Sequence, residues 1–299
     1  MATKTQVRQA AKYYAKKNLS ENFGACVAVS LIASLISSLS ASVGGLFGGV
    51  TIEELSVNAG SITAISDVFS TIPPEFFLGQ GVTLLLGLLI APITIGCYSF
   101  YMHLSRGTKL KVSDLFIWFG DFSLMGKAIG GMLLMTLLLL GWTLLGIVLP
   151  ISILLVMVFV PLAEEMILIL MLPVVLLMFA GVLFVEIKSG AYTAAVYLLA
   201  VNPETGARCA FRTAKEVMRG HLWEFFILQL SFIFWHFLAS VTCGLSVLYV
   251  TPYITLTNCY FFNHVLGDYH RRHNPPTEDD TQNTANEAQQ TSSDDSVNF

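Results

Sequence analysis

Six apolar runs of about twenty residues constrain this chain more than any other feature. A helix rises about 1.5 Å per residue, so each run is long enough to cross roughly 30 Å of hydrocarbon. Because lipid offers the backbone no hydrogen bonds, only helices and closed barrels can cross it, and long runs without polar–apolar alternation exclude a barrel. The sequence therefore predicts an all-α fold, a polytopic membrane helical bundle. Its six transmembrane helices are expected near residues 24–45, 81–102, 128–150, 166–187, 225–246 and 248–267.

Composition points the same way. Hydrophobic residues make up 55% of the 299 residues and charged residues only 12%, with a mean hydropathy of +0.69. There are too few charges to coat a soluble globule of this size. The net charge is −4, which gives no support for nucleic-acid binding. We expect three parts: a cytoplasmic N-terminal amphipathic helix (1–22), a six-helix membrane domain (23–268) and a disordered cytoplasmic tail (269–299).

The basic residues occupy only alternate loops between the apolar runs. Lys and Arg are retained on the cytoplasmic side, so their positions indicate how the chain is threaded. The loops on the other side hold acidic residues and no basic ones. This pattern predicts a multi-pass protein of the cell membrane with both termini in the cytoplasm. The sixteen basic residues are Lys4, Arg8, Lys12, Lys16 and Lys17; Arg106, Lys109, Lys111 and Lys127; Lys188, Arg208, Arg212, Lys215 and Arg219; and Arg271 and Arg272.

Two adjacent carboxylates, Glu164 and Glu165, follow Pro161 in an otherwise apolar stretch. They could form a reaction centre or an ion site, or mark the place where the chain meets water. A carboxylate at a helix centre costs about 2.5–3.5 kcal/mol, whereas an outer turn costs little. We interpret the pair as the first turn of the fourth span. The stretch before it, 127–160, would reach about 50 Å as one helix, so either that helix breaks at Pro150 or the hairpin protrudes.

Three cytoplasmic segments have amphipathic patterns. In the segment from Ala207 to Leu222, basic residues follow one helical stripe and apolar residues a neighbouring one. This pattern is typical of a helix lying in the membrane interface with its basic edge toward anionic head groups. The alternative is a generic solvated face. The predicted lipid- or partner-binding residues are Arg208, Arg212, Lys215 and Arg219.

The other two segments are less regular. At the N-terminus, a stripe of cations from Lys4 to Lys16 runs beside Val7, Ala11 and Tyr14. Between the second and third spans, "KVSDLFIWFGDF" offers Ser113 as a helix N-cap. Its expected apolar side consists of Leu115, Phe116, Phe119 and Phe122.

Polar residues recur on the last two predicted spans. Gln229 and His236 share a helical face with Ser240 and Cys243, and Thr255 and Asn258 share one with Thr251. Two such stripes on consecutive antiparallel helices are expected to face each other. They favour interhelical hydrogen bonding, and the alternative is a hydrated path in which His236 titrates. The residues of this path would be Gln229, His236, Thr255 and Asn258.

No catalytic, metal-binding or cofactor motif accompanies these features. The sequence has no H-E-x-x-H, no G-x-S-x-G and no phosphate-binding glycine loop. The glutamate pair lacks the arginine that intramembrane glutamate proteases need, because Ile169 stands in that place. The five cysteines have no paired spacing and are interpreted as small core residues. We therefore expect no catalytic residue, no metal and no cofactor.

Four stretches resemble the bacterial integral-membrane family known as domain of unknown function 975. They are "VRQAAKYYAKKNLSENFG", "LSRGTKLKVSDLFIWF", "ARCAFRTAKEVMRGHLWEFFILQLSFIFWHFL" and "LYVTPYITLTNCYFF". The resemblance covers most of residues 5–265 and implies a polytopic inner-membrane protein. It supplies no established reaction, so no catalytic residue can be transferred. The stretch 150–175 is longer than the Ile-Pro-Gly turn usual in the family.

These observations predict a non-enzymatic scaffold or accessory factor. Its expected partners are the lipid bilayer, anionic lipid head groups, and either a further copy of the chain or another membrane protein. The alternative is a transporter or channel that uses the polar faces of the fifth and sixth helices.

Overall fold

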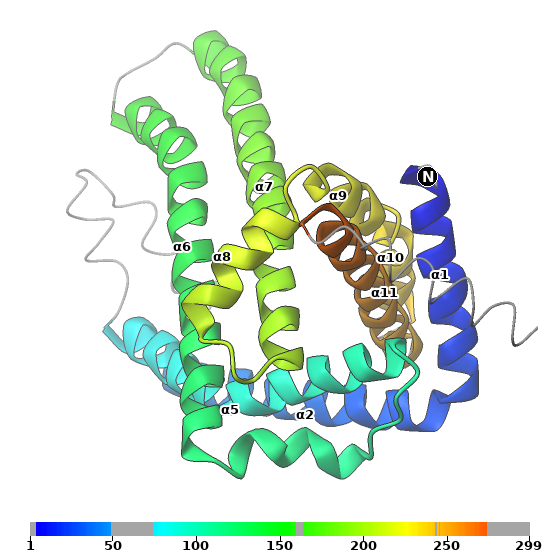
Figure 1. Ribbon diagram of the computed structural model, residues 1–299. Helices are drawn as coiled ribbons and strands as arrows, with labels where there is room; N and C mark the ends of the chain where they lie inside the picture. Colours follow the sequence, from blue (N-terminus) through cyan, green and yellow to red (C-terminus); the bar gives the residue numbers. More distant parts are fainter. Residues whose placement is uncertain (1–3, 49–73, 160–163, 243, 245, 274–299) are drawn as a thin grey trace, which may run out of the picture.

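The computed structural model describes residues 4–48, 74–159, 164–242, 244 and 246–273. Within these ranges every regular element is helical, which confirms the all-α fold class (Figure 1). Residues 49–73 between the first two predicted spans, Pro161, Cys243 and the tail from 274 lie outside the described residues. The elements are α1 (Lys4–Glu21), α2 (Phe23–Gly48), α5 (Pro74–Ser105), the 3₁₀ helix η1 (Val112–Phe119), α6 (Phe122–Phe159), α7 (Glu164–Val201), α8 (Ala207–Val217), α9 (Leu222–Leu230), α10 (Ile233–Val241) and α11 (Val247–His273).

Five helical segments of the described chain are long and apolar enough to cross a membrane. They coincide with the first five predicted spans and run over Phe23–Val43, Pro74–Ser105, Phe122–Leu154, Ile169–Val201 and Leu222–Val241. The sixth predicted span also forms a helix, α11, but it is not among the five. Threonines, asparagines and a histidine interrupt its apolar run, which lowers its hydropathy. The helix continues to His273, past the predicted boundary of the membrane domain at 268.

The third and fourth spans are longer than a bilayer requires. α6 and α7 each have 38 residues, which corresponds to about 57 Å of helix. α6 runs without interruption through Pro150, so of the two alternatives left open by the sequence, the break at Pro150 does not occur. α7 begins at Glu164, as predicted for the glutamate pair.

Apolar side chains cover the outside of these long helices. Leu46 on α2, Leu85 on α5 and Val182 on α7 are each at least 65% exposed. In the most apolar window of α6 none of the described side chains is buried. Water would penalise such a surface heavily, whereas hydrocarbon accepts it. The arrangement is the one expected of a membrane protein.

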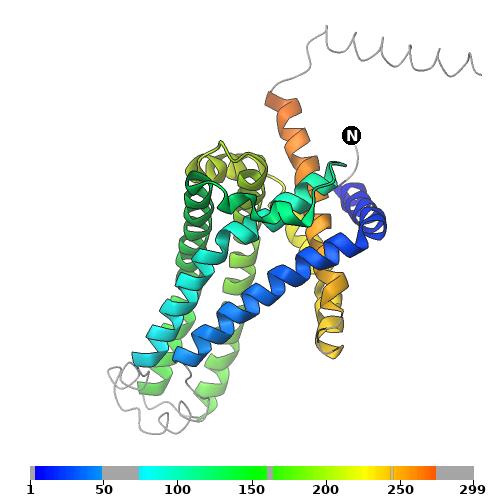
Figure 2. The ribbon, with the colours of Figure 1, turned by 90° about the horizontal axis from the view of Figure 1, so that it is seen from below.

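The long helices differ between their two ends (Figure 2). The end of α2, the start of α5, the end of α6 and the start of α7 gather at the lower end of this view, whereas η1, α8 and the end of α11 lie toward the other end. Most buried side chains belong to the second end. In α7 nearly every residue of 191–200 is buried, while most of 171–187 is exposed or partly exposed. The tightly packed core therefore sits at the end that carries the basic segments.

The predicted fifth span is divided into two helices. Around Ser231 and Phe232 the backbone makes i→i−3 hydrogen bonds, from Ser231 N–H to Leu228 O and from Phe232 N–H to Gln229 O, and α9 ends there. α10 then begins at Ile233. Tighter turns change the rotation per residue, so side chains before and after the break do not keep the spacing of one continuous helix.

The short helix η1 differs from the prediction in its N-cap and in its buried side. Its N-cap is Lys111, not Ser113, and the Lys111 N–H donates to the Asp114 carboxylate at 2.9 Å. With three residues per turn, positions i and i+3 share a face. Leu115 and Trp118 are therefore buried, whereas Phe116, Phe119 and Phe122, predicted for the apolar side, are exposed. η1 packs closely on α5 because Gly96 has no side chain: a Cβ there would lie 2.2 Å from Leu115 O.

Candidate functional site

The predicted basic row lies on α8 and the turn that follows it. Arg208, Arg212, Lys215 and Arg219 are all exposed. α8 has the strongest segregation of polar and apolar faces among the described helices. The helical spacing that predicted a single basic stripe is thus retained in the fold.

The apolar side of α8 packs against protein. Ala210, Phe211, Ala214 and Val217 are buried, and Met218 beyond the helix end is buried too. The helix contacts α7 extensively and α6 to a smaller extent. Burial of this face explains how a short helix of 11 residues is held in place. We predicted that α8 lies in the membrane interface with its apolar side in lipid. Instead, that side docks on the helix bundle, and the basic row is exposed.

The N-terminal helix is docked in the same way. Ala11, Ala15 and Leu19 of α1 are buried, and the helix packs mainly on α11. Asn18 Nδ2 donates to Leu104 O at 2.8 Å and lies 2.9 Å from Tyr260 Oη, so one side chain connects α1, α5 and α11. Of the predicted stripe of Val7, Ala11 and Tyr14, Ala11 is buried against the protein and Tyr14 is exposed.

The residues of the predicted polar path do not share one environment. Gln229 on α9 is partly buried, and His236 on α10 is exposed. Asn258 on α11 is buried, and its Oδ1 has no hydrogen-bond partner among the described residues. Gln229 and His236 lie on different helices, on either side of the break at Ser231.

Thr255, the remaining residue of that set, lines a different pocket. It lies with Thr251 between α11, α2 and α5, in a pocket of about 290 Å³. Tyr101 Oη donates to Cys26 O at 2.8 Å and is 2.6 Å from Ser30 Oγ, which joins α5 to α2 at this place. The pocket is rich in hydroxyl groups. Its lining consists of Val29, Ser30, Ala33, Ser34, Ser37, Thr94, Cys97, Tyr98, Tyr101, Thr251 and Thr255.

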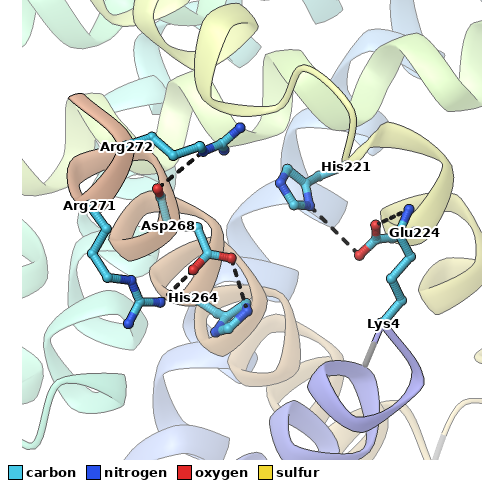
Figure 3. Close-up of polar contacts among 7 residues, drawn as sticks. All are labelled: Lys4, His221, Glu224, His264, Asp268, Arg271 and Arg272. Atoms are coloured by element: carbon cyan, nitrogen blue, oxygen red, sulfur yellow. Dashed lines mark hydrogen bonds and ion pairs between the residues drawn. The ribbon is translucent and has the colours of Figure 1, made fainter. Parts of the chain in front are cut away.

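A second, charged pocket was not predicted from the sequence. It has a volume of about 910 Å³ and lies where the start of α1, the start of α9 and the end of α11 meet. Figure 3 shows its charged side chains in two groups: Asp268 lies with Arg271, His264 and Arg272, and Glu224 lies with Lys4 and His221. Its lining consists of Lys4, Val7, His221, Glu224, His264, Asp268, Arg271 and Arg272. No local pattern reveals it, because its residues come from both ends of the chain.

Two carboxylates organise this charged pocket. Glu224, in the first turn of α9, is 5% exposed. Its Oε1 lies 2.9 Å from Lys4 Nζ, close enough for an ion pair although the two groups are not aligned as a hydrogen bond. Its Oε2 lies 3.7 Å from His221 Nδ1.

Asp268 on α11 is the second carboxylate. It pairs with Arg271 and lies 3.3 Å from His264 Nε2. Partial burial raises the pKa of Asp268, but the hydrogen bond from Arg271 and the charges of His264 and Arg271 outweigh that effect, and the pKa is lowered. The carboxylate is therefore ionised at neutral pH.

The described cysteines are Cys26, Cys97, Cys209 and Cys259, and all four are free thiols. Three are buried, as predicted for small core residues, while Cys209 on α8 is exposed. In the part of the chain that the structure describes, no three His, Cys, Asp or Glu side chains are grouped so that they could hold a metal ion.

The family model described as "Protein of unknown function (DUF975)" matches residues 1–268. The chain belongs to this family. The match includes all of α1 and the bundle, so the DUF975 region of this protein contains both the basic row and the charged pocket up to Asp268. Comparisons with curated proteins and with solved structures gave no match.

Proposed function

We propose that this DUF975 protein is a non-enzymatic scaffold or accessory factor of the bacterial inner membrane. In this proposal the chain crosses the membrane six times, with α11 as the last span, and both termini lie in the cytoplasm. The basic row of Arg208, Arg212, Lys215 and Arg219 then contacts anionic lipid head groups or a membrane partner. Homo-oligomerisation is compatible with this role.

One observation carries the proposal. The apolar side of α8 is buried against α7 while the four cations of α8 and of the turn that follows it remain exposed. A row held rigidly by its own protein presents its charge without the entropy cost of ordering a free segment. Each Lys or Arg near an anionic membrane surface contributes about 1 kcal/mol of attraction. A row of four therefore favours anionic lipid strongly over zwitterionic lipid.

The test replaces Arg208, Arg212, Lys215 and Arg219 by Gln. The protein is placed in phosphatidylcholine nanodiscs, and its association with phosphatidylglycerol vesicles is measured by co-sedimentation at low salt. We expect at least a tenfold weaker association for the fourfold variant and an unchanged melting temperature.

A matched variant supplies the control. Lys16, Lys17, Lys109 and Lys111 are also exposed and belong to predicted cytoplasmic segments. Their replacement by Gln removes the same charge and is expected to weaken association less than threefold. An equal loss of vesicle association in both variants would show that association depends on the net charge of the protein and not on the position of the α8 row.

A second candidate function is a transporter or channel. The hydroxyl-rich pocket between α2, α5 and α11 favours it, because polar groups within membrane-spanning helices commonly line solute paths. The path would differ from the predicted one and would retain only Thr255. Proteoliposomes that show no more proton or monovalent-cation flux than protein-free liposomes would remove this candidate.

A further inference from the structure

The charged pocket between α1, α9 and α11 has the size of a ligand site. Its volume of about 910 Å³ lies in the range of pockets that hold small molecules or head groups. Three separate helices form it, and Lys4 and Asp268 stand far apart in the sequence. Its existence depends on the docking of α1 on α11.

The fixed charges of the pocket leave an excess of one cation. Three side chains in its lining are permanently positive, Lys4, Arg271 and Arg272, and two are negative, Glu224 and Asp268. Glu224 is paired with Lys4, and Asp268 with Arg271. The two histidines in the lining can only add positive charge. The carboxylates are thus already neutralised by protein cations, and the remaining charge is that of Arg272.

The position of Arg272 allows its guanidinium to bind a ligand. It is exposed, and its Nε donates to the backbone O of Asp268 at 3.2 Å. A guanidinium has five N–H donors, so this contact uses one of them. Arg272 also lines an adjacent pocket of about 450 Å³ together with Glu216, Arg219, Gly220 and Tyr269. The two pockets meet at this side chain.

We propose that the charged pocket binds a phosphate group, held by Arg272 and Arg271 with Lys4 on the opposite wall. Phosphate matches the excess positive charge and the planar donor pairs of arginine, which bind phosphate oxygens in bidentate fashion. The site goes beyond the proposed contact of the α8 row, because it uses none of the four α8 cations. Two sources supply the same chemistry: the head group of an anionic lipid, and a free phosphate ester in the cytoplasm.

The experiment uses the full chain in a neutral detergent and measures ligand binding by native mass spectrometry. The probes are dihexanoyl phosphatidic acid, glycerol phosphate and dihexanoyl phosphatidylcholine. We expect saturable binding of one phosphatidic acid per chain and none of phosphatidylcholine. Binding of glycerol phosphate with similar affinity assigns the site to free phosphate esters, and its absence assigns the site to lipid head groups.

Variants separate the pocket from the general surface charge. Arg272→Gln is expected to weaken binding at least tenfold, and Arg272→Lys, which keeps the charge but loses the bidentate geometry, several-fold. Arg208→Gln removes an exposed cation of α8 outside the pocket and is expected to change binding less than twofold.

Two results would overturn the proposal: no saturable binding of either phosphate probe, or an equal loss in Arg208→Gln and Arg272→Gln. The first result would mean that the charged cluster only joins α1, α9 and α11. Folding is checked by the melting temperature, which Arg272→Lys should leave unchanged. Loss of vesicle association in the fourfold α8 variant, with phosphate binding intact, would separate this site from the proposed function.

Discussion

At the residue scale, a few polar side chains connect helices that apolar packing alone would not orient. Asn18 is the clearest example, because its amide group contacts α5 through Leu104 O and α11 through Tyr260 Oη. Asn22 Nδ2 in turn donates to Asn18 Oδ1 at 2.8 Å. On the other side of the bundle, Trp142 Nε1 donates to Tyr192 Oη at 2.6 Å and joins α6 to α7.

Replacement of Asn18 tests this role. Asn18→Ala removes the contacts with Leu104 O and Tyr260 Oη that join α1 to α5 and α11, so we expect a loss of about 1–3 kcal/mol of stability. The measurement is the midpoint of thermal unfolding in neutral detergent. Ser20→Ala is the control, because Ser20 is exposed and its hydroxyl donates to Lys17 O within α1. A similar midpoint for both variants would contradict the role assigned to Asn18.

At the element scale, close backbone approach decides how α6 and α7 pack. Gly146 and Gly181 face each other across these helices, and a Cβ on Gly181 would lie 2.8 Å from Gly146 O. Small residues at such a contact allow helices in lipid to approach closely. This pair is not predictable from the sequence, because it lies within long apolar runs where the glycines have no distinctive spacing.

Gly181→Ala should therefore separate α6 from α7. Overpacking of this kind costs about 1–3 kcal/mol, and we expect a lower unfolding midpoint in detergent. Gly141→Ala on α6 is the matched control, since nothing lies within 4 Å of its added Cβ. That variant should be neutral or slightly stabilising, as alanine favours a helix over glycine. An unfolding midpoint for Gly181→Ala equal to that of the control would show that the two helices are not held by this contact.

At the scale of the whole molecule, the packed end and the apolar end have different surroundings. Basic segments accompany the packed end, and exposed leucines, valines and phenylalanines cover the other half of the long helices. The proposed threading places the packed end in the cytoplasm and the apolar half in the bilayer. Cys209, exposed on α8, is a native reporter of the side of the membrane on which α8 lies.

Labelling of intact cells tests the threading. In a Cys243→Ser background, a membrane-impermeant maleimide should label Cys209 only after permeabilisation, because the proposed topology encloses α8 in the cytoplasm. An added cysteine at Glu75, which is exposed at the start of α5, should react in intact cells. Labelling of Cys209 in intact cells would show that the orientation is the opposite of the proposed one.

Local patterns were sufficient for much of the fold. Hydropathy predicted all-α structure and the first five long apolar segments, because the length and composition of a run determine whether it can be a membrane helix. Helical spacing likewise placed Arg208, Arg212, Lys215 and Arg219 on one exposed row. The break at Ser231 and the 3₁₀ geometry of η1 were beyond such rules, since both depend on small changes in rotation per residue.

Only the tertiary structure decides what the apolar sides of α1 and α8 pack against. The spacing of α1 and α8 shows that each has an apolar side, but lipid and protein satisfy that side equally well, and contacts with α11 and α7 determine the outcome. The charged pocket depends on the same step. Lys4 meets Glu224 only because α1 docks beside α9 and α11, and contacts between residues so far apart arise from packing, which leaves no periodic signal in the chain.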